Sequence, residues 1–202
     1  MNFQTLFPVT LSSFWSDAQH DTLPTHLQSW LLDPNSLTAR LKSHCQQFRV
    51  ELLGQRIESC QENEAVALIP QGEQVLVREV LLFCDDIPQV FARSLLPLPS
   101  LTGAEQTLAT LGNESLGQVL FNNPSLERQA IEVAEFDINS SVGKLAKQLQ
   151  LSVLPQGALP QGKLWGRRSI FVLENKPLMV AEVFLPNAFA YQSNTDSECT
   201  NV

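Results

Sequence analysis

The sequence predicts an α+β fold in which short helices accompany a mostly antiparallel β-sheet. Some segments repeat apolar residues at every second position, as strands do, and others repeat them three and four residues apart, as helices do. The two kinds do not alternate regularly, as they would around a parallel sheet. A length of 202 residues with 44% hydrophobic residues suits one globular domain. We expect a single domain over residues 1–202, with its core at about 23–186 and a flexible tail at 187–202.

A helical hairpin is predicted near the N-terminus. Residues 23–32 carry apolar side chains at helical spacing, and Pro34 ends that pattern. Ser36 can cap a second helix, in which Leu37 and Leu41 fall four residues apart on one face. The short connection between the two segments indicates that the helices are neighbours.

Strands are predicted over the middle and the C-terminal part of the chain. Their segments are rich in β-branched and apolar residues or alternate apolar with charged ones. The pair Asp85-Asp86 and the triplet 174–176 each indicate a turn between two consecutive strands. The predicted strands are residues 48–53, 74–84, 89–96, 131–136, 164–173 and 177–185.

Further helical segments lie between these strands. Residues 103–111 and 115–120 have helical spacing and follow positions rich in Pro and Gly. The long connection over residues 137–163 contains a helix-like segment, 142–149, and a loop at 155–162. This connection could enlarge the cover of a site or be a surface insertion.

The charge pattern argues against nucleic acid as a partner. The formal net charge is -8 and the pI is about 4.8, and no basic run is longer than the pair Arg167-Arg168. The sequence also lacks the glycine-rich motifs of nucleotide-cofactor sites. Its histidines, His20, His26 and His44, form no close pair at metal-ligand spacing. We therefore expect no cofactor and no metal.

The cysteines and the hydropathy pattern indicate a cytoplasmic protein. The spacing of the four cysteines suits neither a zinc site nor a disulfide scaffold, so we expect reduced thiols; they are Cys45, Cys60, Cys84 and Cys199. Residues 1–20 lack the features of a signal peptide. No stretch approaches the ~18 apolar residues of a membrane span.

Two charged residues fall where apolar residues are expected. In the strand 74–84, Arg78 shares a face with leucines and valine, because side chains two apart point the same way. Glu182 occupies the same kind of position in the strand 177–185. A buried ion without a partner is unfavourable by several kcal/mol. Two explanations remain: an internal salt bridge, from Arg78 to Glu182 or to Glu79, or a binding site.

Five segments, in this order, resemble the chorismate pyruvate-lyase family. They are LVREVLL (76–82), PLPSLTG (97–103), SLGQVLF (115–121), LWGRRS (164–169) and KPLMVAEVFLP (176–186). The resemblance covers about residues 27–186, and LWGRRS followed by a strand ending in E-x-F-L-P is its most specific part. It implies a six-stranded, mostly antiparallel sheet with helical flaps that cover a buried ligand site.

The resemblance also implies which residues form the site. Arg78 would bind the ring carboxylate, for which a planar guanidinium is well shaped, and Glu182 would lie near the ligand hydroxyl. Leu116 and Leu37 would contribute to substrate binding, Leu37 at a position that is often Met in the family. Taken without the resemblance, both leucines would be ordinary core residues.

The implied activity is a lyase reaction that eliminates pyruvate from chorismate and leaves 4-hydroxybenzoate, the first committed step of ubiquinone biosynthesis. We expect catalysis by Glu182 and Arg78, no cofactor, and a monomer. A second carboxylate of chorismate could be bound by Arg93, Arg167 or Arg168, of which the last two face opposite ways by parity. The alternative is a non-catalytic, sensor-type domain of the same fold that binds a small aromatic acid.

Overall fold

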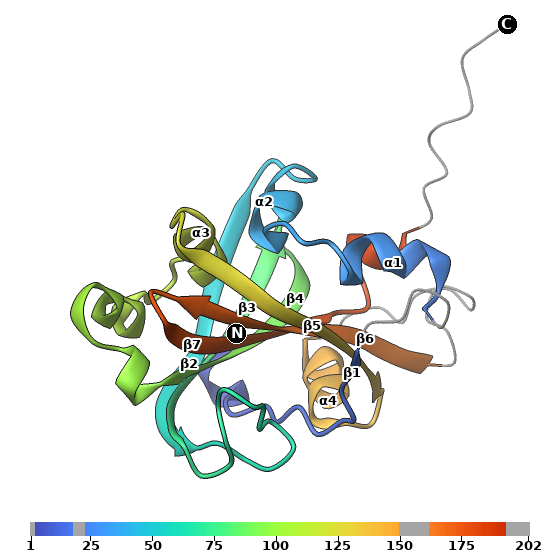
Figure 1. The fold of residues 1–202 in the computed structure, drawn as a ribbon. Helices are drawn as coiled ribbons and strands as arrows, with labels where there is room; N and C mark the ends of the chain where they lie inside the picture. Colours follow the sequence, from blue (N-terminus) through green and yellow to red (C-terminus); the bar gives the residue numbers. More distant parts are fainter. Residues whose placement is uncertain (1–2, 18–22, 150–161, 193–202) are drawn as a thin grey trace, which may run out of the picture.

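The computed structural model describes residues 3–17, 23–149 and 162–192, which form one seven-stranded sheet with helices on both faces (Figure 1). Neighbouring strands are antiparallel throughout, and their order is β1-β5-β6-β7-β4-β3-β2. The strands are β1 (Ser16–Asp17), β2 (Phe48–Ser59), β3 (Gln74–Cys84), β4 (Ile87–Pro97), β5 (Leu126–Asp137), β6 (Lys163–Leu173) and β7 (Lys176–Phe184).

The expected six strands are therefore corrected to seven. The six long strands overlap the predicted segments, and the additional strand is β1, in which Ser16 pairs with Val133 at the edge of the sheet. Both residues of β1 are exposed. Two exposed residues show no alternation of apolar and polar side chains, so periodicity could not identify them.

The two turns expected between consecutive strands form tight hairpins. Asp85 and Asp86 have φ of 48° and 64°, and Glu174 and Asn175 have φ of 49° and 61°. Positive φ at both central residues matches the right-handed twist of the flanking strands, and Asp and Asn tolerate this conformation well. The β3–β4 and β6–β7 hairpins thus place their strands side by side.

Each face of the sheet is covered by its own helices, and β3 shows how the faces differ. Val80 and Leu82 belong to the core that includes the first helices, and we call their side the Val80 face. Leu81 and Phe83 belong to a separate core on what we call the Leu81 face. Figure 1 shows α1 (Thr25–Leu31), α2 (Leu37–Lys42) and α3 (Leu116–Phe121) on one side and α4 (Ser141–Gln148) on the other.

Serine residues set the starts of the helices that matter for the site. The Ser36 hydroxyl accepts a hydrogen bond from the Ala39 amide and begins α2, as predicted. Ser115 accepts from the Gln118 amide and begins α3 in the same way. The helix expected at 103–111 is a 3₁₀ helix, Gly103–Thr110.

The core extends beyond the expected limits of 23–186 in both directions. On the Leu81 face it includes Val9, Leu11 and Trp15, which are buried. At the other end, Tyr191 is 3% exposed; its hydroxyl accepts from the Trp165 amide and donates to a backbone carbonyl. Of the expected flexible tail, residues 188–191 therefore pack against the core, Gln192 is exposed, and residues 193–202 lie outside the described residues.

The long connection before β6 contributes a helix to the Leu81 face. The segment expected at 142–149 is α4, and Val142, Leu145 and Ala146 pack into the core of that face. This helix therefore lies on the side of the sheet away from α2 and α3. Most of the loop expected at 155–162 lies outside the described residues.

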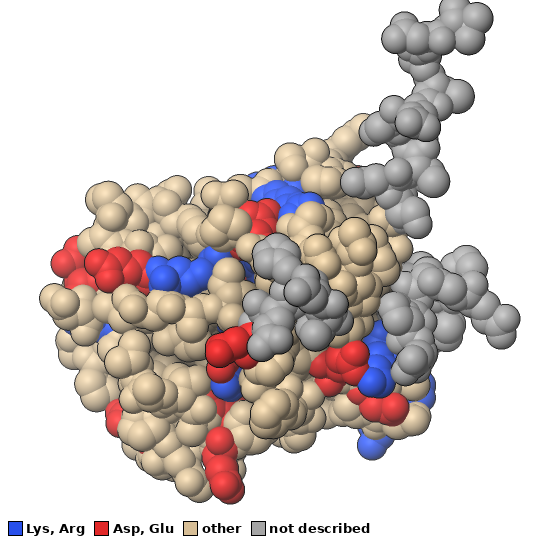
Figure 2. All heavy atoms as spheres, turned by 45° about the vertical axis from the view of Figure 1, so that its right-hand side comes forward, with Lys and Arg blue, Asp and Glu red and all other residues tan. Residues whose placement is uncertain are grey.

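Among the described residues, no helix combines the length and apolar character needed to cross a bilayer. On the face shown in Figure 2, acidic and basic side chains are scattered among uncharged ones. The basic residues visible there do not gather into one large patch.

Candidate functional site

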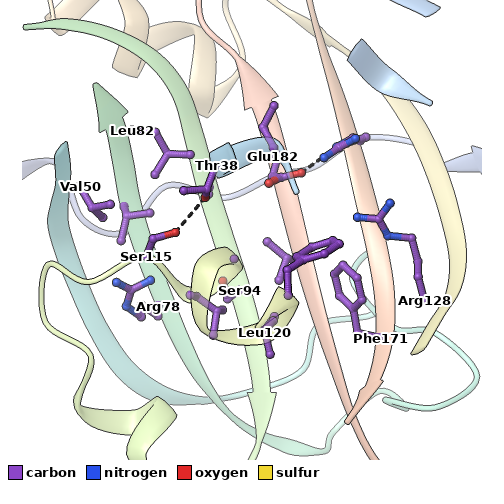
Figure 3. A pocket seen from close by; sticks show the side chains of 18 residues that line it. Thr38, Val50, Arg78, Leu82, Ser94, Ser115, Leu120, Arg128, Phe171 and Glu182 are labelled. Atoms are coloured by element: carbon purple, nitrogen blue, oxygen red, sulfur yellow. Dashed lines mark hydrogen bonds and ion pairs between the residues drawn. The ribbon is translucent and has the colours of Figure 1, made fainter. Parts of the chain in front are cut away.

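A pocket lies on the Val80 face, between the sheet and helices α2 and α3. The four residues expected at the site, Arg78, Glu182, Leu116 and Leu37, all line it. Figure 3 shows Arg78 and Glu182 in this pocket. Its empty space is about 40 Å³ as traced by the centre of a water molecule, more than the ~10–15 Å³ that one water needs. Apolar side chains make up most of its wall, among them Val80, Leu82, Ala92, Leu120, Phe171 and Val180.

The strand register explains why Arg78 and Glu182 face the same space. Arg78 of β3 pairs with Ser94 of β4, whereas Glu182 of β7 pairs with Ala92, two residues along the same strand. Residues two apart on one strand point to the same side of the sheet. Strand spacing and rise then put the two Cα atoms roughly 12 Å apart. Both side chains reach into one pocket, and they form no ion pair with each other.

Arg78 is a buried cation that has no carboxylate partner among the described residues. Its side chain is 1% exposed, and its Nη2 donates to the carbonyl oxygens of Gly112 and Glu114 at 2.9 and 2.8 Å. Its Nε is buried and donates to no atom of the described chain. Burial lowers the pKa of the Arg78 guanidinium to about 10. An anion in the pocket would compensate this charge.

Neither predicted salt bridge of Arg78 is present. Glu182 pairs instead with Arg167 on the adjacent strand β6, with 2.7 Å between Oε2 and Nε. Glu79 points to the Leu81 face, where it accepts hydrogen bonds from the Val9 amide and from Arg93. Of the two explanations for the buried charges, the internal salt bridge to Arg78 is therefore wrong.

The arginines expected to supply a second cation to the site lie on different faces of the sheet. Arg167 is 1% exposed and lines the pocket, as parity allowed for one member of the pair. Arg168 points away from the pocket and pairs with Glu132. Arg168 is also buried, so neither arginine of the Arg167-Arg168 pair is exposed to solvent. Arg93 was a wrong candidate because it lies on the Leu81 face, bound to Glu64 and Glu79 at 2.6 Å each.

A third guanidinium in the pocket escaped the sequence analysis. Arg128 lies on β5 opposite Phe171 of β6 and lines the pocket. Its pKa is lowered to about 10, mainly by burial and also by the nearby Arg167, while the carboxylates of Glu182 and Asp33 act in the opposite direction. The predicted strand began only at residue 131, and a bulge between Arg128 and residue 130 breaks the alternation. Arg128 could have been predicted at the site only if the expected strand had been extended across that bulge.

Glu182 carries the only carboxylate among the described residues that line the pocket. Its Oε2 accepts from Arg167, and its Oε1 has no partner in the described chain. Arg167 is itself anchored, because its Nη1 donates to the carbonyl oxygens of Trp30 and Asp33 at 3.1 and 2.9 Å. The ion pair therefore holds one carboxylate oxygen in place and leaves the other available to a ligand hydroxyl.

Helices α2 and α3 meet over the pocket. Leu37 and Leu116, which are 3% and 5% exposed, are the first residues of the two helices and line the pocket. The hydroxyl oxygens of Thr38 and Ser115 lie 2.8 Å apart in a hydrogen bond that joins the helices, drawn as a dashed line in Figure 3. The two helices and the hydrogen bond between them therefore cover the pocket on this side.

The balance of charge in the pocket favours an anion. Three guanidinium groups and one carboxylate line it, although the whole chain has a formal net charge of -8. Once the ion pair of Arg167 and Glu182 is set aside, Arg78 and Arg128 have no carboxylate within ion-pair distance among the described residues. An apolar, largely enclosed wall strengthens their attraction for a negatively charged ligand.

The fold and the pocket define an α+β protein with an enclosed, cationic pocket on one face of an antiparallel sheet. Two solved structures share this fold. PhnF from Mycobacterium smegmatis gives a TM-score of 0.52 at 14% identity, over 76% of this chain and 65% of that one. The ligand-binding domain of a GntR-family regulator from Bordetella bronchiseptica gives 0.50 at 17%, over 73% and 88%.

The chain belongs to the chorismate lyase family, whose model matches residues 11–194. Two relatives are named "Probable chorismate pyruvate-lyase". The one from Psychromonas ingrahamii is 41% identical over 188 residues, covering 93% of this chain and 97% of the relative. The one from Pseudoalteromonas translucida is 41% identical over 186 residues, covering 92% and 98%. The expected family is confirmed.

Proposed function

We propose that the protein is an enzyme that eliminates pyruvate from chorismate and releases 4-hydroxybenzoate. One structural observation carries the proposal. Among the described residues, the buried guanidinium of Arg78 has no carboxylate partner, and Glu182 is the one carboxylate that lines its apolar pocket. A para-substituted aromatic acid matches this arrangement, with its carboxylate at Arg78 and its hydroxyl at Glu182. Membership of the chorismate lyase family supports the same reaction.

The reaction itself defines what the protein has to supply. The C–O bond between ring carbon C3 and the enolpyruvyl oxygen breaks, and the hydrogen on C4 leaves as a proton, so that the ring becomes aromatic. The enolate that departs takes up a proton and becomes pyruvate. No net oxidation occurs, and aromatisation makes the reaction strongly downhill. Positioning, charge stabilisation and proton transfer are the tasks that fall to the side chains.

Each predicted site residue has a role in this proposal. Arg78 fixes the ring carboxylate through its free Nε, while the carbonyls of the 112–114 turn hold the guanidinium in place. Glu182 accepts a hydrogen bond from the 4-hydroxyl through Oε1 and assists proton transfer there. Leu116 and Leu37 complete the apolar wall that holds the ring.

Helices α2 and α3 act as flaps in this proposal. The substrate has to pass between them to reach the pocket, and the hydrogen bond between the Thr38 and Ser115 hydroxyls breaks when they open. A closed pocket keeps water from the reacting ring and strengthens the attraction between the guanidinium groups and the anionic substrate.

A binding domain without catalytic activity is the second candidate. The fold shared with the ligand-binding domain of a regulator favours it, since a pocket of this kind can retain an aromatic acid without converting a substrate. The two candidates differ in one observable property: only the enzyme forms pyruvate and 4-hydroxybenzoate in equal amounts.

The experiment is incubation of the purified chain with chorismate. Pyruvate is followed through a coupled dehydrogenase, and 4-hydroxybenzoate by chromatography, against a blank without protein. We expect both products in a 1:1 ratio at a rate well above the blank. Binding of 4-hydroxybenzoate without any product above the blank would establish the sensor-type alternative instead.

A Glu182→Gln variant tests the role of the carboxylate. We expect kcat to fall about 100-fold or more, within the ~10²–10⁴ range for the loss of a general acid or base. An unchanged kcat would remove Glu182 from the mechanism. The remaining expectations, namely a role in ubiquinone biosynthesis, a cytoplasmic location, a monomeric state and no nucleic-acid partner, stay predictions that accompany this proposal.

A further inference from the structure

Arg128 is one of three cations among the described residues that line the pocket. Its Nη1 donates to the Asp33 carbonyl oxygen at 3.1 Å, and its guanidinium lies 4.8 Å from the ring centre of Phe171 and 5.4 Å from that of Phe121. Its Nε is buried and has no partner in the described chain. The carboxylate of Asp33 is directed to Arg40 instead. Arg128 is thus held against aromatic rings with an unused donor, and no carboxylate of the described part of the chain lies within ion-pair distance.

The other candidate cations are already neutralised by carboxylates. Arg167 pairs with Glu182 and donates to two backbone carbonyls, Arg168 pairs with Glu132, and Arg93 lies on the other face of the sheet. Among the described residues that line the pocket, only Arg78 and Arg128 combine a buried, partnerless Nε with the absence of an ion pair. Figure 3 shows these two side chains on opposite sides of the pocket, with apolar side chains between them.

Two separated cations that have no carboxylate partner in the described structure fit a ligand with two separated carboxylates. Chorismate carries one carboxylate on its ring and another on its enolpyruvyl group, whereas 4-hydroxybenzoate keeps only the first. With the ring carboxylate at Arg78, the enolpyruvyl arm extends from the ring next to the hydroxyl, toward the Glu182 side. Arg128 lies near that side, because it shares the Asp33 carbonyl oxygen with Arg167, which is the ion-pair partner of Glu182.

We infer that Arg128 binds the enolpyruvyl carboxylate of the substrate, so that the pocket distinguishes the dianionic substrate from the monoanionic product. This inference rests on the proposed function, because it assigns the second carboxylate of that same substrate. When the C–O bond breaks, this carboxylate leaves with the pyruvate, and Arg128 has no further contact with the aromatic product. Of these two cations, both therefore contribute to substrate affinity, and only Arg78 contributes to product affinity.

The inference also connects substrate binding to the helical hairpin. Arg128 and Arg167 both donate through Nη1 to the Asp33 carbonyl oxygen, in the connection between α1 and α2. A carboxylate bound at Arg128 fixes this guanidinium and so the backbone that leads into α2. Substrate is thereby expected to favour the closed position of α2 more than product does.

The experiment compares Arg128→Gln with the wild type in two measurements on the full chain. The first is KM for chorismate, and the second is Kd for 4-hydroxybenzoate by calorimetry. We expect KM to rise about 10- to 100-fold, as for the loss of a hydrogen bond to a charged group, and Kd to change by less than about threefold. Arg56→Gln removes an exposed cation outside the pocket and serves as the control for net charge.

Arg128→Lys keeps the charge but loses the planar guanidinium, and we expect a smaller rise in KM with the same unchanged Kd. It also carries the test if Arg128→Gln does not fold, as judged by circular dichroism. An equal weakening of substrate and product in either folded variant, or an unchanged KM, would overturn the inference. If the wild type forms no product, the proposed function fails, and Kd for chorismate replaces KM in the same comparison.

Discussion

Replacement of Arg78 by Met should stabilise the ligand-free protein while it abolishes ligand binding. Methionine is unbranched and flexible, so it can follow the path of the arginine stem within the apolar row of β3. The substitution removes a charge that has no carboxylate partner in the described chain, and it leaves two carbonyl oxygens, of Gly112 and Glu114, without their donor. The net effect on stability depends on these two opposing terms.

The magnitude follows from the burial of the guanidinium. Its pKa of about 10 lies below the usual 12.5. At every pH below 10, burial of this charge therefore lowers the free energy of unfolding. At about 1.4 kcal/mol per pKa unit, the difference corresponds to about 3 kcal/mol. Loss of the hydrogen bond to each of the two carbonyl oxygens destabilises the folded state by roughly 1 kcal/mol. We therefore expect Arg78→Met to raise the free energy of unfolding by about 1 kcal/mol at pH 7.

Thermal unfolding with and without 4-hydroxybenzoate measures both effects. For a chain of this length, 1 kcal/mol corresponds to roughly 2–4 °C in Tm, so ligand-free Arg78→Met should unfold a few degrees higher than the wild type. Ligand at 100 times Kd stabilises the wild type by about 2.7 kcal/mol, or roughly 5–10 °C, and the variant should show no such increase. Arg56→Met makes the same substitution at an exposed arginine and serves as the matched control.

Two outcomes would refute this reasoning. A ligand-free variant that unfolds several degrees below the wild type would show that Arg78 holds the fold together through its carbonyl contacts. A variant that keeps the full increase in Tm with 4-hydroxybenzoate would show that the ligand carboxylate binds elsewhere. The Arg56→Met control must keep both the Tm and the ligand response of the wild type.

Two other contacts lead to separate predictions. Burial, opposed by hydrogen bonds from Val9 and Arg93, raises the pKa of Glu79 from 4.5 to about 7. The folded state therefore favours the protonated form of this carboxyl. As a result, the free energy of unfolding falls by up to about 3 kcal/mol as pH rises from about 4.5 to 7. Urea unfolding at several pH values should show this fall in the wild type and a smaller one in Glu79→Gln; parallel curves would contradict the assignment. Thr38→Val removes the bond to Ser115 between the flaps and should speed 4-hydroxybenzoate dissociation about fivefold in stopped-flow measurements, and an unchanged rate would show that this bond does not limit opening.

The described fold contains the predicted strands and helices because most of them carry a regular pattern of apolar residues. The β3–β4 hairpin is an example: both strands are almost entirely buried, and Asp85 and Asp86 supply the positive φ that its turn requires. The edge strand β1 has no such pattern, since its position depends on pairing with β5 rather than on its own residues. Strand order likewise depends on contacts between distant segments, which local periodicity does not encode.

For the site, alternation along single strands was enough to predict that Arg78 and Glu182 each lie in an apolar row. It also separated Arg167 from Arg168, because adjacent residues of a strand point to opposite faces. It could not assign partners. Glu182 pairs with Arg167 because β6 and β7 are neighbours in register, and that register is a property of the assembled sheet.

The sequence by itself determined the fold class, the family and two of the charged residues at the pocket, because these follow from short patterns of side chains along the chain. Only the tertiary structure decided that Arg93 lies on the opposite face and that Arg128 enters the pocket. A buried charge is defined by what surrounds it, and its surroundings come from strands far apart in sequence. The bulge before residue 130 shifts the alternation of β5, so the direction of Arg128 became evident only once β5 and β6 were paired.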